Sequence, residues 1–239
     1  MKMKLTILNY PLSMLMFVML TSISFKNDVV LIDQPNTPVS ATGTVTDKDG
    51  NVYKTVIIGN QTWMAENLKT TKYRNGDPIP QVLENAKWGT LKTGAYCFYN
   101  NDPTKKTTYG ALYNWLAVID KRNIAPAGWH IPTDQEWATL TTFLGGRDQA
   151  GGKLKETLTT HWLDPNTGAT NSTGFSGLPG GYRNSAGVSD KAGYCGGWWS
   201  STAYSTTVAW YRYTDYSTSN LYSCSGFKNS GFSVRCIKD

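Results

Sequence analysis

The chain has only two histidines, His130 and His161, so few positions could carry acid–base chemistry near neutral pH. An enzyme would need a concave pocket with converging titratable groups, and His130, Glu136 and Asp215 are the residues around which such a site could form. The same histidine also stands at the entry to a predicted helix, where packing or capping is the simpler interpretation. We therefore expect no catalytic residue and keep an enzyme with a site near His130 and Glu136 as an alternative.

Two other motifs begin like ligand-binding loops but lack the remaining residues that such loops require. Residues 47–51 (DKDGN) open like a calcium-binding loop but lack the later ligands and the closing glutamate. Residues 177–181 (GLPGG) lack the Lys-Ser/Thr pair of a phosphate-binding loop. We interpret both segments as turns, and we expect neither a metal site nor a cofactor.

A tyrosine-rich segment near the C-terminus offers the best candidate binding surface. Tyrosine and serine together are typical of antibody-like contact surfaces, because they combine rigid contact area with adaptable hydrogen bonding. The alternative is a tyrosine-rich sheet with ordinary cross-strand packing. We predict that ligand contacts come from Tyr211, Tyr213, Asp215, Tyr216, Tyr222 and Phe227, and that Trp198 and Trp199 are buried scaffold.

Residues 211–227 contain no Lys, Glu, Gln, Met or Trp. These are the residue types that cannot arise when asparagine codons are randomised at their adenines. The segment is therefore a candidate for a diversified variable region, although a short Ser/Tyr-rich stretch can lack five residue types by chance.

The elements that must position these residues are predicted to begin as a β-meander. Asp49-Gly50 separates two apolar runs, which predicts a hairpin, and residues 61–68 predict a third strand. Helices are predicted at 110–119 and 133–144. The second helix has a capping box formed by Thr133 and Glu136.

Short strands are then predicted at 94–99, 197–202, 209–214 and 232–237. Strands, two helices and more strands indicate an α+β fold with a mixed or antiparallel sheet and long Gly/Ser-rich loops.

The N-terminus has the pattern of an export signal. Lys2 and Lys4 precede an apolar run at 11–25, which is shorter than the roughly 20 residues of a membrane span. We predict a signal peptide at 1–25, a linker at 26–42 and one domain at 43–239; an uncleaved N-terminal anchor is the alternative. No cysteine precedes Cys97, so the sequence does not predict a lipid anchor on an N-terminal cysteine.

The formal net charge is +6, but the basic residues are scattered and their longest run is Lys105-Lys106. Nucleic-acid binding would require a clustered basic stripe, so we do not expect it.

Several segments, taken in order, resemble the Fibrobacter succinogenes major paralogous domain family of exported proteins from Bacteroidota-type bacteria. The resemblance covers about 43–239 and rests on WMAENL (63–68), YGALYNW (109–115), GWHIPTDQEW (128–137), GGKLK (151–155), GATN (168–171), LPGGYR (178–183), WWSST (198–202) and GFSVRC (231–236). It implies a C-type-lectin-like fold, in the variant shared with formylglycine-generating enzymes. The calcium-binding triplets of lectins and the cysteine pattern of those enzymes are both missing from the sequence, so neither chemistry is carried over.

Four cysteines permit two disulfides in an exported chain, and no C-x-x-C motif supports a zinc or redox site. Cys97 and Cys236 lie in family-like contexts, and the ends of the implied fold tend to meet in one sheet. We therefore predict a disulfide between Cys97 and Cys236, and leave Cys195 and Cys224 either paired or free.

These observations predict a secreted or cell-surface domain that is not an enzyme and that binds a glycan or a surface protein. A structural component of a surface assembly is the alternative, and exposed edge strands would be its sign. The sequence leaves the oligomeric state open.

Overall fold

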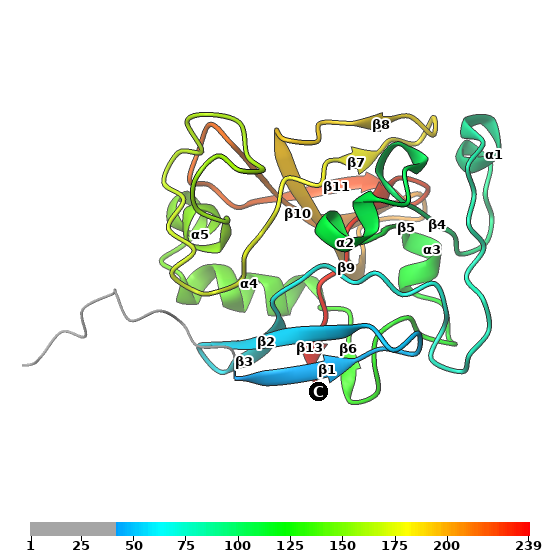
Figure 1. Cartoon of the computed structure of the whole chain (residues 1–239), viewed down its shortest axis with the longest axis horizontal. Helices are drawn as coiled ribbons and strands as arrows, with labels where there is room; N and C mark the ends of the chain where they lie inside the picture. Colours follow the sequence, from blue (N-terminus) through cyan, green and yellow to red (C-terminus); the bar gives the residue numbers. More distant parts are fainter. Residues whose placement is uncertain (1–41) are drawn as a thin grey trace, which may run out of the picture. The chain divides into compact units, whose positions relative to one another are not determined.

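Three antiparallel sheets organise residues 42–239, the part of the chain that the computed structural model describes (Figure 1). The predicted signal peptide, and the predicted linker up to residue 41, lie outside the described residues. None of the helices within 42–239 has the length and apolar character needed to span a membrane.

The first sheet has the spatial order β1-β2-β3-β13-β6. Its strands are β1 (Gly43–Thr46), β2 (Val52–Ile58), β3 (Gln61–Met64), β13 (Ile237–Lys238) and β6 (Trp129–His130). The predicted β1–β2 hairpin is confirmed, and Gly50 takes a φ of 83° at its turn. The Asp47 carboxylate accepts hydrogen bonds from the main-chain N–H groups of Asp49 and Asn51, so this segment is a turn.

The second sheet has the order β11-β10-β9 and contains the longest strands. It consists of β9 (Cys195–Ala203), β10 (Val208–Asp215) and β11 (Tyr222–Phe227). The third sheet has the order β4-β5-β12-β7-β8. Its short strands are β4 (Tyr96–Cys97), β5 (Leu112–Asn114), β12 (Gly231–Phe232), β7 (Tyr182–Arg183) and β8 (Ser189–Asp190).

The helices of residues 42–239 are short, and two of them begin with a side-chain cap. They are α1 (Asn85–Gly89), the 3₁₀ turn η1 (Tyr99–Asn101), α2 (Lys105–Tyr109), α3 (Trp115–Val118), α4 (Asp134–Phe143) and α5 (Arg147–Leu154). The predicted capping box of α4 is confirmed. The Thr133 hydroxyl accepts from the Glu136 N–H at 3.2 Å, and the Glu136 carboxylate accepts from the Thr133 N–H at 2.7 Å.

Residues Gly231–Lys238 connect the three sheets to one another. β12 is paired on both sides in the third sheet, and β13 lies between β3 and β6 in the first. Between them, Ser233 exchanges main-chain hydrogen bonds with β9: its N–H donates to Gly197, and its carbonyl accepts from Trp199. Gly231–Ile237 are all buried.

Tryptophan fills the core between the sheets and α4. Trp63 and Trp137 have ring centroids 4.7 Å apart, and Phe175 meets the ring of Trp198 edge-on at 5.6 Å. The predicted scaffold role of Trp198 and Trp199 is confirmed, since both are fully buried. The tryptophans with the least exposure are Trp63, Trp88, Trp137, Trp162, Trp198 and Trp199.

The predicted α+β, C-type-lectin-like fold is wrong. The structure is mostly β, with 30% strand and 18% helix, and its antiparallel sheets curl into half-barrels. The main local error is at 110–119, where Leu112–Asn114 pair as β5 with β4 and β12. Only one helical turn, α3, follows, with the Asn114 side chain accepting from the Ala117 N–H at 3.0 Å.

The predicted disulfide between Cys97 and Cys236 is also wrong, because all four cysteines are free thiols. Cys97 lies in the third sheet in a cluster with Trp88 and Leu112, whereas Cys236 belongs to a separate core cluster beside β13. Both thiols pack as small apolar groups. Burial raises the pKa of Cys97 to about 11, which keeps it a neutral thiol at ordinary pH.

Candidate ligand-binding surface

The central strand β10 presents alternate side chains to opposite faces of the second sheet. Tyr211 and Tyr213 lie on the face that also carries Cys224 and Tyr222 of β11, their cross-strand partners. Trp210 and Arg212 lie on the other face. The strand predicted at 209–214 is therefore confirmed as β10.

Tyr211 supports the core instead of facing a ligand. Its ring stacks on Phe232, with centroids 4.2 Å apart and an interplanar angle of 18°. It also meets Trp199 edge-on at 6.0 Å. Burial raises the pKa of its hydroxyl, as expected for a phenol removed from water.

Tyr213 and Tyr222 lie side by side on this face, with ring centroids 6.0 Å apart. The Arg147 guanidinium at the start of α5 lies 4.7 Å from the centre of the Tyr222 ring. The Asn220 side chain donates to the Tyr222 hydroxyl at 3.1 Å. Both tyrosines are half-buried, so each has a fixed ring and retains some exposed surface.

Tyr216 follows the end of β10 and packs against Tyr194. Its ring meets Tyr194 edge-on at 5.3 Å, and its N–H donates to the Tyr194 carbonyl. Asp215 accepts from the N–H and hydroxyl of Ser217 at 2.8 and 2.7 Å, so its carboxylate shapes the turn. We call Tyr194, Tyr213, Tyr216 and Tyr222, together with Arg147, the tyrosine patch.

Phe227 does not join the tyrosine patch. It pairs with Val208 and so faces the Trp210 side of the sheet, where it is 57% exposed. The six predicted contact residues thus do not form one surface. Tyr213 and Tyr222 pack together, Tyr216 packs on Tyr194, Asp215 shapes a turn, and Tyr211 and Phe227 lie elsewhere. Tyr194 and Arg147 were not predicted, because they precede the tyrosine-rich segment in sequence and reach it only through the fold.

Several residues of the segment 211–227 are buried and help to hold the fold together. Arg212 is buried, forms an ion pair with Asp134 at 2.5 Å and donates to the Ser223 hydroxyl at 2.9 Å. Thr214 and Leu221 are buried as well. Free variation along the whole segment would disturb these contacts, so only its exposed positions can change without cost to the fold.

His130, the other candidate position, is held by two carboxylates. Its Nε2 lies 2.8 Å from Glu136 Oε1, and its Nδ1 lies 2.7 Å from Asp239 Oδ1. Burial alone would lower the pKa of His130, but the hydrogen bonds to Asp239 and Glu136 outweigh burial and raise it. Because both ring nitrogens are engaged, neither is free to take a proton from a substrate in this geometry.

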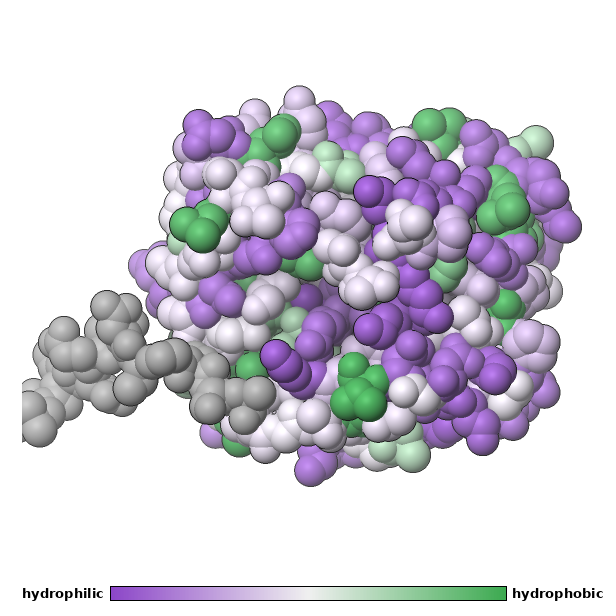
Figure 2. All heavy atoms as spheres, in the orientation of Figure 1, coloured by the Kyte–Doolittle hydropathy of each residue, from purple (hydrophilic) through white to green (hydrophobic). Residues whose placement is uncertain are grey.

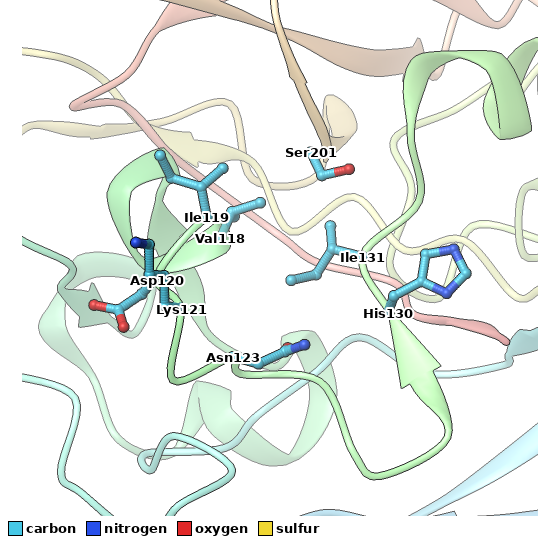
Figure 3. A pocket seen from close by; sticks show the side chains of 8 residues that line it. All are labelled: Val118, Ile119, Asp120, Lys121, Asn123, His130, Ile131 and Ser201. Atoms are coloured by element: carbon cyan, nitrogen blue, oxygen red, sulfur yellow. The ribbon is translucent and has the colours of Figure 1, made fainter.

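A pocket of about 300 Å³ opens beside His130 (Figure 3). Its walls mix apolar and polar side chains: Val118, Ile119, Asp120, Lys121, Asn123, His130, Ile131 and Ser201. Figure 3 shows the imidazole turned away from Asp120 and Lys121, which lie on the opposite side. Asp120 itself is paired with Arg122 at 2.9 Å. No acid–base pair converges in this pocket.

Within residues 42–239, no three His, Cys, Asp or Glu side chains are placed to share a metal ion. On the face shown in Figure 2, apolar residues are scattered among polar ones and form no continuous apolar area.

The mostly antiparallel fold with its tryptophan core defines a β domain that carries polar and aromatic side chains on its loops. The sequence pattern described as the Fibrobacter succinogenes major domain matches residues 56–238. The chain belongs to this family, which confirms the resemblance of the sequence segments. Comparison with curated proteins and with solved structures finds no match, so the lectin-like resemblance gains no support from them.

Proposed function

We propose that the domain is a non-catalytic, exported binding module that recognises a surface protein through the tyrosine patch. The observation that carries this proposal is the grouping of partly exposed tyrosines on a rigid frame. Tyr213 lies on β10, which pairs with the buried Trp198 and Trp199 of β9, and Tyr222 lies opposite Tyr213 on β11. Tyr194 and Tyr216 contact each other edge-on. Rigid tyrosines lose little conformational entropy on binding, which makes them effective contact residues.

The state of the titratable groups supports a binding role over an enzymatic one. His130 has both ring nitrogens engaged by carboxylates, and the Arg212 guanidinium is engaged by Asp134 and Ser223. These groups stabilise the fold in the positions they occupy. An enzyme would instead need a base and an acid directed together into one cavity.

The arrangement of the rings favours a protein ligand over a glycan. Sugar stacking requires an open aromatic face, but Arg147 lies over Tyr222, and Tyr194 and Tyr216 meet edge to face. The hydroxyl groups and ring edges remain available, and these suit hydrogen bonding to a polypeptide surface.

The test compares patch variants with an exposed aromatic outside the patch. Tyr216→Ala and Tyr222→Ala should each weaken binding to envelope proteins about 10-fold or more, roughly 1.4–2 kcal/mol, with an unchanged melting temperature. Tyr204→Ala is the control, because Tyr204 is 58% exposed and packs on Trp210, away from the patch.

Treating the envelope material separately with proteinase and with periodate identifies the ligand class. Loss of binding after proteinase alone supports the proposal. Loss after periodate alone would show a glycan ligand and contradict it, as would equal effects of the patch and control variants.

A structural role in a surface assembly is a second candidate, because β11 stands at the edge of its sheet. Its six residues alternate between exposed and half-buried and include no proline or charged residue to discourage pairing with another strand. Replacing the exposed Ser225 with lysine should abolish concentration-dependent assembly if this role is correct, and sedimentation velocity would measure the change.

A further inference from the structure

A buried lysine lies beneath the connection between β10 and β11. Lys155 follows α5 and has no exposed surface. Its ammonium donates to the main-chain carbonyls of Thr167, Asp215 and Thr218 at 2.9, 2.9 and 2.7 Å. All three donors of the ammonium are therefore used, and every acceptor is main chain.

Other main-chain contacts hold the same connection. The Tyr216 N–H donates to the Tyr194 carbonyl, and the Leu221 N–H donates to the Arg147 carbonyl at 2.8 Å. The carbonyls of Tyr216 and Ser219 accept from the N–H groups of Thr167 and Gly152, at 2.8 and 2.9 Å. Both ends and the middle of the connection are thus fixed to α5 and its neighbouring loops.

Two glycines of α5 allow this close approach. A Cβ added to Gly151 would lie 2.2 Å from the carbonyl oxygen of Asn220, and one added to Gly152 would lie 2.3 Å from that of Gly168. A side chain at position 151 would push the connection away from the helix. A side chain at position 152 would first collide with the loop at Gly168 and would then crowd Ser219 Cβ at 3.2 Å. The GGKLK segment therefore provides one very close glycine contact, one tight glycine contact and one buried cation beside the connection.

The loop's own side chains contribute much less to its position. Ser217 bonds to Asp215, and Asn220 bonds to Tyr222 and Thr218, so these contacts stay within the β10–β11 hairpin. Among contacts within residues 42–239, only the Ser219 hydroxyl reaches another element by a side-chain hydrogen bond, at the Asp148 carbonyl. The loop is therefore bonded to other elements almost entirely through its own main-chain groups. For this reason it can keep its shape when its side chains change.

We infer that residues 216–220 are the specificity-determining loop of the tyrosine patch, with a backbone fixed by Lys155, Gly151 and Gly152 independently of the loop's side chains. This inference rests on the proposed function. Its partner is a protein surface, contacted by the side chains at 216–220 together with Tyr213 and Tyr222. Leu221 ends the loop because its side chain is buried in the core.

The first experiment tests the anchoring without any ligand. One variant replaces residues 216–220 by alanine, a second is Lys155→Met, and the control is Lys153→Met, which loses a single hydrogen bond to the Leu144 carbonyl. Hydrogen exchange is measured at the amides of Tyr216, Leu221 and Gly152. The alanine loop should retain their protection within about threefold, whereas Lys155→Met should lower it at least 10-fold and Lys153→Met should not.

The second experiment tests specificity. A display library randomised at 216–220 is selected against lysozyme as a probe protein, on the native frame and on the Lys155→Met frame. Lysozyme binders should come from the native frame at least 10-fold more often.

Loss of amide protection in the alanine loop, or a folded native-frame library without binders, would overturn the inference. If Tyr222→Ala leaves binding of envelope proteins unchanged while the anchoring results hold, the proposed function fails and the anchoring stands.

Discussion

Arg235 is the most informative residue for testing how this fold is held together, because its guanidinium is buried and pairs with no carboxylate of residues 42–239. It donates to Asn67 Oδ1 at 2.8 Å, to the Met64 and Ser176 carbonyls at 3.1 Å each, and to the Phe175 carbonyl. It also lies 4.2 Å from the centre of the Phe175 ring. One cation thus connects the end of β3 to the loop at 175–176.

The variant Arg235→Met keeps most of the side-chain volume and removes the donors. Three buried carbonyls would lose their partner, at a cost of about 1–2 kcal/mol each, or about 3–6 kcal/mol in total. Removing a buried charge recovers part of this cost, so we expect a net loss of about 3 kcal/mol. For a domain of this size, that corresponds to a melting temperature about 6–12 °C lower.

Differential scanning calorimetry of Arg235→Met measures this shift, and Arg122→Met is the control. Arg122 has a side chain that is 41% exposed and pairs with Asp120 and Asp77 on the surface. Such exposed pairs contribute little to stability, because water and salt screen them. If Arg235→Met costs no more than Arg122→Met, the buried guanidinium does not hold β3 to the loop as argued.

Three further predictions follow from burial and charge. His130→Ala should lower the free energy of unfolding most between about pH 5 and 6.5. The pKa of His130 is raised in the folded state, so the stabilisation by its charged form is lost as the pH rises through that pKa. The pKa of Glu136 is lowered, so the stabilisation by its carboxylate is lost as the pH falls through that pKa. Urea titrations at pH 5.5 and 8.5 should differ by up to about 1 kcal/mol, and equal losses would refute this. Trp198→Ala should cost about 3–5 kcal/mol by urea denaturation, and a loss below about 1 kcal/mol would contradict its core role. Iodoacetamide should alkylate Cys224 first, as read by peptide mass spectrometry, since the other three thiols are buried; faster labelling of any of them would be inconsistent with the fold.

The features predicted correctly from the sequence are those fixed by nearby residues. The β1–β2 turn depends on Asp47 and Gly50, and the start of α4 depends on Thr133 and Glu136, so their signals lie within four residues of each other. The strand predicted at 209–214 is found as β10, and its signal is also local, because side chains that alternate between two faces are neighbours in sequence.

The features that were missed depend on partners distant in sequence. The apolar spacing at 110–119 suits a helix, but β5 forms because β4 and β12 supply hydrogen-bond partners. Lys155 and Arg235 bind main-chain carbonyls, which every residue possesses, so no sequence pattern identifies their acceptors. The same reasoning explains why the tyrosine patch includes Tyr194, which was not predicted, and excludes Phe227, which was.

The connecting segment Gly231–Lys238 has a consequence for how the chain folds. Ile237 pairs with Trp63, and Phe232 pairs with Tyr113, so two sheets receive an interior strand from residues that are made after all the other strands of residues 42–239. During synthesis the earlier strands of both sheets lack hydrogen-bond partners along one edge until this segment has been made. Long-range pairing of this kind slows folding, and it makes the transition all-or-none instead of stepwise. A nascent chain that stops before residue 231 should therefore remain unfolded and sensitive to protease, and eight further residues should convert it to the native state.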